Sequence, residues 1–518
     1  MATTRRTMHP AAGPDCEAFR LRTVLDRLRD AGELEVVEEQ TALADLAARM
    51  DGNPRAVLFR RAGAEGAEVL GNLLASRRRT ALALGADERT LLPEILRRLQ
   101  TPQPVVEVGA AAAPVQRVVR QGEAADLTRL PVPFQHGMDG GPYLSATLDY
   151  VTNPASGVTN VGCRRLMLRG RRQTGIDLHA PSDLKAIYEA AAMRGECLPI
   201  AFTVGSHPAD YVAATMRIPM DETDLVARLR GAPLPVVKCV TNDIRVPADA
   251  EIVLEGWLDP AGFTEEEGPY GEFLGYYGGM RKNPVFNLTA ITMREDPLFL
   301  TATISGRRID CTDTAQLNAI KSEAVVWQAL TSAIREPVAV NATAAAGGMF
   351  NLRLSMRQRV PGEARNAIAA VFGCLGNVKH VFVVDDDIDI FDDRQMDWAL
   401  ASRFQADRDL VVQTGFRAVP IDPSLTGSRV GAKAGFDLTL PFGRREDLEF
   451  SVAKPPEPEG ARFADVRAAL AAGPRTFEQL MAATGSRDGR DIVLALESLR
   501  EEGRLRRMPK TGAYALED

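Results

Sequence analysis

A series of short β-rich runs in the middle of the chain constrains the fold more than any other feature. The runs are rich in β-branched and aromatic residues, and Gly, Pro and Asn residues separate them. Because these strands follow one another without regular helices between them, the pattern predicts a barrel-like sheet instead of a doubly wound one. The runs are LSATLDYVTN, RRLMLRG, PIAFTVG, PVVKCVTND, AEIVLEGWL, PVFNLTAITM and PLFLTATIS, within residues 144–305.

Helical patterns flank the β-rich runs on both sides. Before them, CEAFRLRTVLDRLRDAG and DERTLLPEILRRLQ predict helices, and PRAVLFRRAG predicts a strand between the two. After them, TAQLNAIKSEAVVWQALTSAI predicts a long helix. FNLRLSM, GEARNAIAAVFG and HVFVVDDDIDIF then predict a strand, a helix and a strand. Since 518 residues are too many for one hydrophobic core, we expect several domains in a mixed α/β (α+β) protein.

The expected division has five parts, and proline-rich AKPPEPEGAR precedes the last of them. This last part is predicted to hold two helices, a turn at Gly485 between them and a two-stranded wing, which resembles a winged helix. It has ten Lys and Arg residues against nine Asp and Glu, so packing or oligomerisation is favoured and a nucleic-acid partner is not expected. The parts are an N-terminal α/β portion (1–110), a central split-β-barrel-like domain (111–310), a linking helix (311–335), a C-terminal α/β domain (336–453) and the winged-helix-like appendage (461–518).

The net charge and the cysteines exclude several classes of protein. A net charge of -7 gives no general attraction to nucleic acid or to anionic lipid. The six cysteines are scattered and form no CxxC pair, which fits neither a disulfide framework nor a zinc cluster. The start, MATTRRTMHPAAGPD, has no apolar core of a secretory signal, and no apolar run approaches the roughly 20 residues of a membrane helix. We therefore expect a cytoplasmic protein without a membrane partner.

The stretch EEEGPYGEFLGYYGG contains the first candidate for chemistry. Glu267 and Glu272 are five residues apart, with Gly268, Pro269 and Gly271 between them, so the backbone can fold sharply and bring both carboxyls to one cavity. Two close carboxylates push each other's proton affinities apart, which suits acid/base work near neutral pH. The alternative is a solvated acidic loop, and the stretch alone favours that alternative.

Three further places contain residues suited to binding an anion or a metal ion. In TNVGCRRLMLRG, Asn160 and Arg165 flank Gly162, an arrangement that suits an anion but also an ordinary loop leading into a strand. His179 lies beside Leu178, and a lone histidine beside leucine is more often a core residue than a ligand. Taken alone, Glu222 fits well as a carboxylate at the start of a helix, where it favours the helix dipole.

Together these motifs resemble the UbiD family of reversible decarboxylases, which use prenylated flavin mononucleotide. The resemblance extends from about Leu130 to Pro441, and the order and spacing of the motifs also agree. It implies a central flavin-binding domain and a C-terminal oligomerisation domain. The strongest elements are TNVGCRR, VVKCVTNDIRVPADAEIVLEGWL, EEEGPYGEFLGYY and VFVVDDDIDIF.

The resemblance also implies a ligand set. Asn160, His179 and Glu222 match the positions that hold a divalent metal, usually manganese, which bridges the protein and the cofactor phosphate. Amide, imidazole and carboxylate ligands suit a hard ion that carries phosphate. A monovalent ion, commonly potassium, is also implied nearby. The positions implied to contact the cofactor are Asn160, Val161, Gly162, Cys163, Arg164, Arg165, Leu178, His179, Thr215, Met216 and Glu222.

Arg165, Glu267 and Glu272 match the catalytic network of the family. By the resemblance, Glu272 protonates the carbon left when carbon dioxide departs, and Arg165 pairs with Glu267 and stabilises the substrate carboxylate. The glycines near these residues would let the flavin and the substrate approach the backbone.

Two positions depart from the family pattern. A lysine that reaches the cofactor phosphate in some relatives aligns near Gly373 and Cys374, and Lys379 lies close to that place without aligning. Leu178 replaces a polar residue of some relatives, which implies a more apolar cavity edge.

The expected function is therefore reversible, non-oxidative decarboxylation of an α,β-unsaturated or (hetero)aromatic carboxylic acid. A flavin prenyltransferase would supply the cofactor, and the enzyme would be a homodimer or a larger homo-oligomer. The shape of the substrate pocket would depend on residues such as Phe273 and those from Thr314 to Leu317. Two alternatives remain: a flavin-independent hydrolase with two carboxylates, and a flavin-sensing regulator that acts through the C-terminal module.

Overall fold

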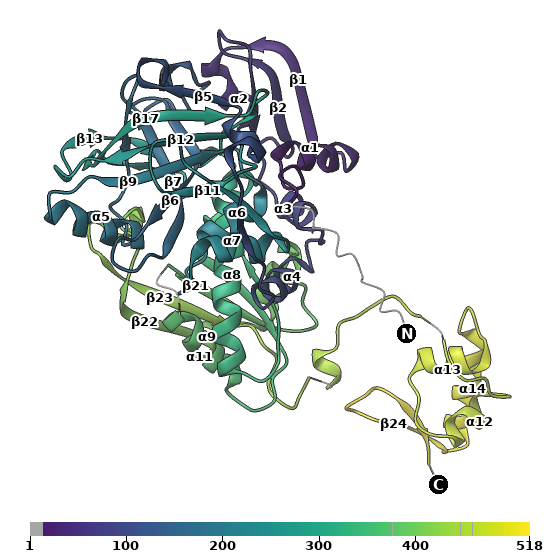
Figure 1. The fold of residues 1–518 in the computed structure, drawn as a ribbon. Coiled ribbons are helices and arrows are strands. Elements are labelled where there is room, and N and C mark those ends of the chain that lie inside the picture. The colour runs from purple at the N-terminus through teal and green to yellow at the C-terminus, as the bar shows by residue number, and fades with distance from the viewer. Residues whose placement is uncertain (1–13, 375–376, 446, 458, 518) are drawn as a thin grey trace, which may run out of the picture.

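A computed structural model describes residues 14–374, 377–445, 447–457 and 459–517. Most of the opening stretch on which the expectation of no secretory signal rests lies outside these residues. The protein has a mixed α/β fold, as expected (Figure 1). Within the described residues, no helix combines the length and the apolar composition needed to cross a membrane.

A four-stranded sheet with the order β1-β2-β3-β18 forms the N-terminal portion. Its last strand comes from PLFLTATIS, a run expected to belong to the barrel, and pairs in parallel with β3. Pro93 is the third residue of α4, where it lies in the first helical turn and costs no intrahelical hydrogen bond. The elements are α1 (Leu21–Asp30), β1 (Leu34–Thr41), α2 (Leu46–Met50), β2 (Ala56–Ala62), β3 (Ala67–Gly71), α3 (Arg77–Leu84), α4 (Leu91–Leu99) and β18 (Phe299–Leu300).

Six strands in the order β12-β9-β6-β7-β8-β17 close into a barrel, because β17 also pairs with β12. This confirms the expected barrel. Strand β5 (Val118–Gln121) adds to the far end of β17, beyond the residues that pair with β8. The barrel strands are β6 (Tyr143–Thr152), β7 (Thr159–Leu168), β8 (Gln173–Ile176), β9 (Leu198–Val204), β12 (Ile252–Leu258) and β17 (Val285–Met293).

The central region also contains helices, contrary to the expectation that none separate its strands. They are 8 to 11 residues long, and α6 is buried from Pro208 to Ala213. A helix that is buried all round has no polar face, so its sequence shows little helical periodicity. The run PVVKCVTND, in turn, joins a separate three-stranded sheet with the order β11-β10-β4. The elements are β4 (Val105–Glu107), α5 (Asp183–Met193), α6 (Pro208–Thr215), α7 (Glu222–Arg230), β10 (Leu234–Lys238) and β11 (Arg245–Pro247).

Helix α8 (Asp313–Ala333) leads from the barrel to the C-terminal sheet (Figure 1). Trp327 on this helix packs against the core that α8 shares with the barrel helices and also against the core of the C-terminal sheet. Strand β21 ends at Asp385, before the end of the run HVFVVDDDIDIF that was expected to form it. The two acidic residues that follow the strand, Asp386 and Asp387, form ion pairs with Arg445 and Arg403. The sheet has the order β19-β20-β21-β23-β22. The elements are β19 (Pro337–Ala342), β20 (Asn351–Met356), α9 (Glu363–Cys374), β21 (His380–Asp385), α10 (Asp393–Arg403), α11 (Ala406–Asp409), β22 (Leu410–Arg417) and β23 (Val430–Asp437).

The last part of the chain forms a small unit with its own hydrophobic cluster, which lies apart from the rest in Figure 1. A capping box between Thr476 and Gln479 starts its second helix, and Gly485 ends that helix in a left-handed conformation. The resemblance to a winged helix stays a prediction. Its elements are α12 (Val466–Ala471), α13 (Phe477–Thr484), α14 (Arg490–Glu501), β24 (Leu505–Arg507) and β25 (Tyr514–Leu516).

Candidate active site

Two short hairpins bring the paired glutamates together. Strand β13 (Glu265–Glu267) pairs with β16 (Arg281–Asn283), and β14 (Tyr270–Gly271) pairs with β15 (Tyr277–Gly278). Glu267 therefore ends one hairpin strand, and Glu272 directly follows another. Gly268 between them has a φ of 97°, which favours glycine.

The glycines of this segment make room for protein side chains. A Cβ on Gly271 would lie 2.5 Å from Nδ1 of His136, and a Cβ on Gly278 would lie 2.8 Å from Oε1 of Glu272. These glycines therefore permit the close packing that positions Glu272. Their expected role, admitting the flavin and the substrate, has no contact in this structure to support it.

Arg165 binds three carboxylates at once. Its Nε lies 3.2 Å from Oε1 of Glu267, its Nη1 lies 3.2 Å from Oε1 of Glu272, and its Nη2 lies 3.1 Å from Oδ2 of Asp177. The guanidinium also lies over the Tyr270 ring, 4.6 Å from the ring centroid. Glu267 is buried and accepts a further hydrogen bond from the side-chain amide of Asn283. We name Arg165, Glu267, Glu272 and Asp177 the arginine–carboxylate cluster.

The surroundings change the proton affinities of this cluster. Burial raises the pKa of Glu272, Arg165 opposes the rise, and the negative charges of Asp177 and Glu267 add to it. For Asp177, burial also favours the neutral form, but Arg165 and a hydrogen bond from the His179 backbone N–H outweigh it and lower the pKa. Glu272 is therefore the member of the cluster best suited to carry a proton.

Asp177 is a member that the sequence did not predict. It directly follows strand β8, and its Oδ1 lies 3.2 Å from the backbone nitrogen of His179. A charged side chain two residues before a histidine was the signal that could have identified it.

Asn160 and Glu222, two of the three predicted metal ligands, lie together. The Nδ2 of Asn160 donates a 2.6 Å hydrogen bond to Oε2 of Glu222, and the Val161 backbone N–H donates to the same oxygen. Glu222 is also the first residue of α7, as the helix-start interpretation predicted. Burial, together with the charge of Asp149, raises its pKa to about 7. The Oδ1 of Asn160 is buried and has no hydrogen-bond partner among the described residues.

His179, the third predicted ligand, makes different contacts. Its Nε2 lies 3.0 Å from the Lys282 carbonyl oxygen, and its ring lies 5.6 Å from the Phe263 ring. Across the part of the chain that the structure describes, no three His, Cys, Asp or Glu side chains are close enough to hold a metal ion. The structure thus brings Asn160 and Glu222 together and leaves the His179 ring on the Lys282 carbonyl.

A cavity of about 270 Å³, which we name the reaction cavity, opens beside the arginine–carboxylate cluster. Of the predicted cofactor contacts, Cys163, Arg164, Arg165 and Thr215 line it, together with Glu272. Asn160 and Glu222 line a second cavity of about 540 Å³. Three other predicted contacts, Val161, Leu178 and Met216, have side chains buried in the hydrophobic cores.

The remaining predicted contact, Gly162, allows a close approach between two strands. A Cβ at this position would lie 2.8 Å from Oδ1 of Asp149 on β6 and 3.4 Å from the Arg164 guanidinium. Glycine is therefore needed here for packing around a buried carboxylate.

The suspected pocket-shaping residues also line the reaction cavity. Phe273 comes from the loop after Glu272, and Thr314 and Leu317 come from the first turns of α8. The sequence named these residues but could not place them.

Lys321 is a cation that the sequence did not predict. It lies four residues after Leu317 on α8, so both side chains lie on the same face of the helix. Burial, together with the positive charge of Arg217, lowers its pKa to about 8. Among the described residues it has no hydrogen bond or ion pair that would neutralise it.

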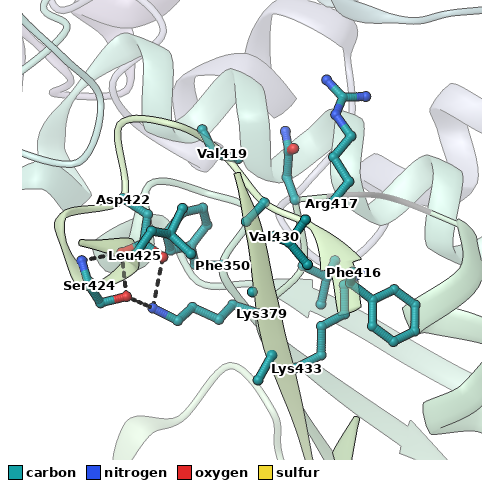
Figure 2. A pocket seen from close by; sticks show the side chains of 15 residues that line it. Phe350, Lys379, Phe416, Arg417, Val419, Asp422, Ser424, Leu425, Val430 and Lys433 are labelled. Atoms are coloured by element: carbon teal, nitrogen blue, oxygen red, sulfur yellow. Dashed lines mark hydrogen bonds and ion pairs between the residues drawn. The ribbon is translucent and has the colours of Figure 1, made fainter. Parts of the chain in front are cut away.

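Lys379 lies in a different cavity, of about 300 Å³, in the C-terminal domain (Figure 2). Its Nζ donates hydrogen bonds to Oδ2 of Asp422 at 2.8 Å and to Oγ of Ser424 at 2.7 Å. None of the predicted site residues lines this cavity. Gly373 and Cys374, where the family lysine aligns, form the end of α9.

Comparison with known proteins gives matches along most of the chain. Three family models match, described as the N-terminal, Rift-related and C-terminal domains of 3-octaprenyl-4-hydroxybenzoate carboxy-lyase (UbiD), over residues 25–99, 106–308 and 315–438. Anhydromevalonate phosphate decarboxylase of Methanosarcina mazei is 31% identical over 436 residues, which cover 83% of this chain and 98% of the relative.

Solved structures of similar fold include flavin complexes. The UbiD-class enzyme HmfF from Pelotomaculum thermopropionicum, in complex with FMN, is 33% identical with a TM-score of 0.79, covering 84% of this chain and 97% of that one. An evolved dimeric form of HmfF in complex with prFMN is 32% identical with a TM-score of 0.76, covering 85% and 97%. Klebsiella pneumoniae 3,4-dihydroxybenzoic acid decarboxylase (AroY) is 27% identical with a TM-score of 0.78, covering 85% and 98%.

Proposed function

The chain belongs to the UbiD family of carboxy-lyases, and from this premise we propose that it decarboxylates an α,β-unsaturated or (hetero)aromatic carboxylic acid, reversibly and without net oxidation, using prenylated FMN. One observation carries the proposal. Arg165 holds Glu272, a carboxyl with a raised pKa, at the wall of a cavity large enough for a small molecule.

The side chains of the cluster then have separate tasks. Arg165 binds the substrate carboxylate, and Glu267 and Asp177 hold the guanidinium in place. When the carbon–carboxylate bond breaks, carbon dioxide leaves and the electron pair stays on the substrate carbon. Glu272 gives its proton to that carbon and is reprotonated from water. The prenylated flavin supplies the electron sink for this step.

The residues around Asn160 fit a hard divalent cation such as Mn²⁺. The buried Oδ1 of Asn160 has an unused lone pair, and Glu222 supplies a carboxylate beside it. His179 completes the set once its ring releases the Lys282 carbonyl. The metal would hold the cofactor phosphate to β7 and α7, with a potassium ion nearby.

Positive charge near the reaction cavity suits the phosphate of a flavin. Lys321 and Arg217 are two cations within interaction range of each other, and Lys321 is also within interaction range of Cys163 on the cavity wall. Two like charges are repulsive until an anion lies between them. We propose that Lys321 contacts the cofactor phosphate. In some relatives this contact is made by the lysine that aligns near Gly373 and Cys374.

The relatives name two kinds of substrate. Several curated relatives are named for anhydromevalonate phosphate, whereas some structural neighbours are named for dihydroxybenzoic and vanillic acids. Both kinds are candidates for this chain. A flavin prenyltransferase would supply the cofactor, and the protein would form a homodimer or a larger homo-oligomer, in line with the evolved dimeric form of HmfF.

The test is reconstitution with prenylated FMN. The holoenzyme should absorb in the near ultraviolet and visible range and should release carbon dioxide from at least one small acrylic or aromatic acid in deuterated water, with deuterium in the product. Ester or amide hydrolysis without flavin would instead support the two-carboxylate hydrolase. Salt-sensitive DNA binding without turnover would support the regulator.

A further inference from the structure

Among the described side chains that line the reaction cavity, only Arg164 and Arg165 are cationic, and both lie on β7. Each already has an acidic partner. The Nε of Arg164 lies 3.3 Å from Oδ1 of the buried Asp149, and Arg165 contacts the three carboxylates of its cluster. Under the proposed function, Arg165 also receives the carboxylate that leaves. The lining therefore offers no further cation to a second anionic group.

The cavity wall away from β7 is apolar or accepts hydrogen bonds. Phe273, Ile304 and Leu317 supply the apolar surface. The charged residue in this part of the wall is Asp313, a buried carboxyl that accepts hydrogen bonds from Leu74 N at 2.5 Å and from Thr303 N and Oγ1 at 2.7 Å each. Burial raises the pKa of this carboxyl and outweighs the three donors, and because all three donors already bind Asp313, none of them is free for a second anion. An anion next to this wall would find no cation among the described residues that line it.

Resting on the proposed decarboxylase function, we propose that the substrate is a monocarboxylic acid whose only anionic group is the carboxylate that leaves. Its body is an apolar unsaturated chain or a single ring that packs against Phe273, Ile304 and Leu317. A second carboxylate or a phosphate would be buried unpaired beside Asp313, which selects against it.

The experiment compares pairs of acids that differ by one carboxylate. The pairs are cinnamate with 4-carboxycinnamate and benzoate with terephthalate, titrated into the holoenzyme by isothermal calorimetry and assayed for carbon dioxide release. In at least one pair the monoacid should bind at least tenfold more tightly than the diacid. Equal or tighter binding of the diacid in both pairs, or no binding of either monoacid, overturns the proposal.

A substitution at Leu317 tests whether the apolar wall sets the preference for the monoacid over the diacid. Leu317→Arg adds a cation to the apolar wall, so it should narrow or invert the difference between monoacid and diacid, whereas Leu317→Met changes the shape without adding charge and should not. An unchanged ratio in a folded Leu317→Arg protein with full flavin content would show that the wall does not set the preference, against the proposal.

The decarboxylase function and the preference for a monoacid can each be disproved without the other. If neither acid of a pair releases carbon dioxide but the monoacid still binds more tightly, the decarboxylase function is wrong for these acids and the charge preference holds. If the holoenzyme releases carbon dioxide from the diacid in preference to the monoacid, the decarboxylase function holds and the monoacid preference is wrong.

Discussion

Nη1 of Arg165 lies 3.2 Å from Oε1 of Glu272, so a permanent cation touches the carboxyl that has to carry a proton. Arg165 pulls the pKa of Glu272 down, while burial and the neighbouring carboxylates push it up, and the net shift is upward. Because three carboxylates share one guanidinium, the titration belongs to the cluster as a whole. This balance between one cation and three anions is the basis of the predictions on catalysis.

Glu272→Gln should abolish proton delivery and leave the site assembled. Glutamine keeps the size of the side chain and a hydrogen bond to Arg165, but it carries no acidic proton. Turnover and deuterium incorporation should fall by at least about 10²-fold, because a general acid contributes roughly 10²- to 10⁴-fold. The measurement is product deuterium by mass spectrometry at matched flavin content. Near-wild-type incorporation would transfer the donor role to Glu267 or to water.

The decarboxylation rate should fall as the pH rises. The pKa of Glu272 is raised, so its acid form persists to higher pH than that of an ordinary glutamate and is lost as the pH passes through that raised value. A profile of kcat against pH should therefore show a descending basic limb. The limb should be absent from the residual activity of Glu272→Gln; if it persists there, another group sets it.

Asp177→Asn should move that limb to lower pH. The charge of Asp177 raises the pKa of Glu272, and its removal lowers that pKa. The variant should also lose about tenfold in kcat, because one of three contacts that orient Arg165 becomes weaker. Asp243→Asn, an exposed aspartate paired with Lys238, is the control. A reduced rate with an unshifted limb would assign Asp177 a purely structural role.

Glu222→Gln should lose metal and flavin together. The substitution removes the charge beside Oδ1 of Asn160, where we place the ion that carries the cofactor phosphate. Metal content by plasma mass spectrometry and flavin content by absorbance should fall in parallel. Glu189→Gln, on the exposed face of α5, should retain both. A Glu222→Gln protein with a full flavin complement and no metal would disprove the bridging assignment.

Lys321→Met should weaken binding of FMN but not of riboflavin. A charge-assisted hydrogen bond to phosphate contributes about 1.5 to 3 kcal/mol, which corresponds to about 10- to 100-fold in affinity. Riboflavin has no phosphate and should bind equally to both proteins. Because the pKa of Lys321 is about 8, wild-type affinity for FMN should also decline above that pH, and the variant should lack this decline.

Fluorescence quenching of the flavin measures both affinities. Lys238→Met removes an exposed lysine outside the cavity and serves as the control. Equal losses for FMN and riboflavin in Lys321→Met would mean that Lys321 supports the fold of α8 and not the phosphate.

Periodicity predicted the long elements well. Helix α8 runs from Asp313 to Ala333 and α9 from Glu363 to Cys374, each within one residue of the sequence pattern. The pattern failed for α6 and α7, because these short helices are buried on more than one face and alternate little between polar and apolar residues. Helix α5 was also missed, although its buried residues lie on one face at helical spacing. A strand was predicted at PLFLTATIS, where β18 lies, but not its place in the N-terminal sheet, because the pattern of one segment does not identify the strand that pairs with it.

The site was predictable where the motif fixes the backbone and unpredictable where partners meet only in space. Arg165, Glu267 and Glu272 converge as expected, since strand β7 and the two hairpins position them. Asp177 and Lys321 were missed because no sequence motif surrounds them. Each interacts with a residue that is distant in the sequence, Asp177 with Arg165 and Lys321 with Arg217. His179 shows the converse: its motif is recognisable, yet its ring contacts a backbone carbonyl.

The closed barrel has a consequence for how this protein can change. Strand β7, which carries Asn160 and Arg165, pairs with β6 along most of its length and with β8 over Leu166–Leu168, so the closed ring restrains the strand that positions both residues. The wall of the reaction cavity that would contact the substrate acid comes instead from α8 and from the loop after Glu272. Substitutions at Leu317 or Phe273 can thus alter which acid is accepted while the proton-transfer apparatus stays in register. Selection for a new substrate can therefore change the cavity wall while the residues that transfer the proton stay the same.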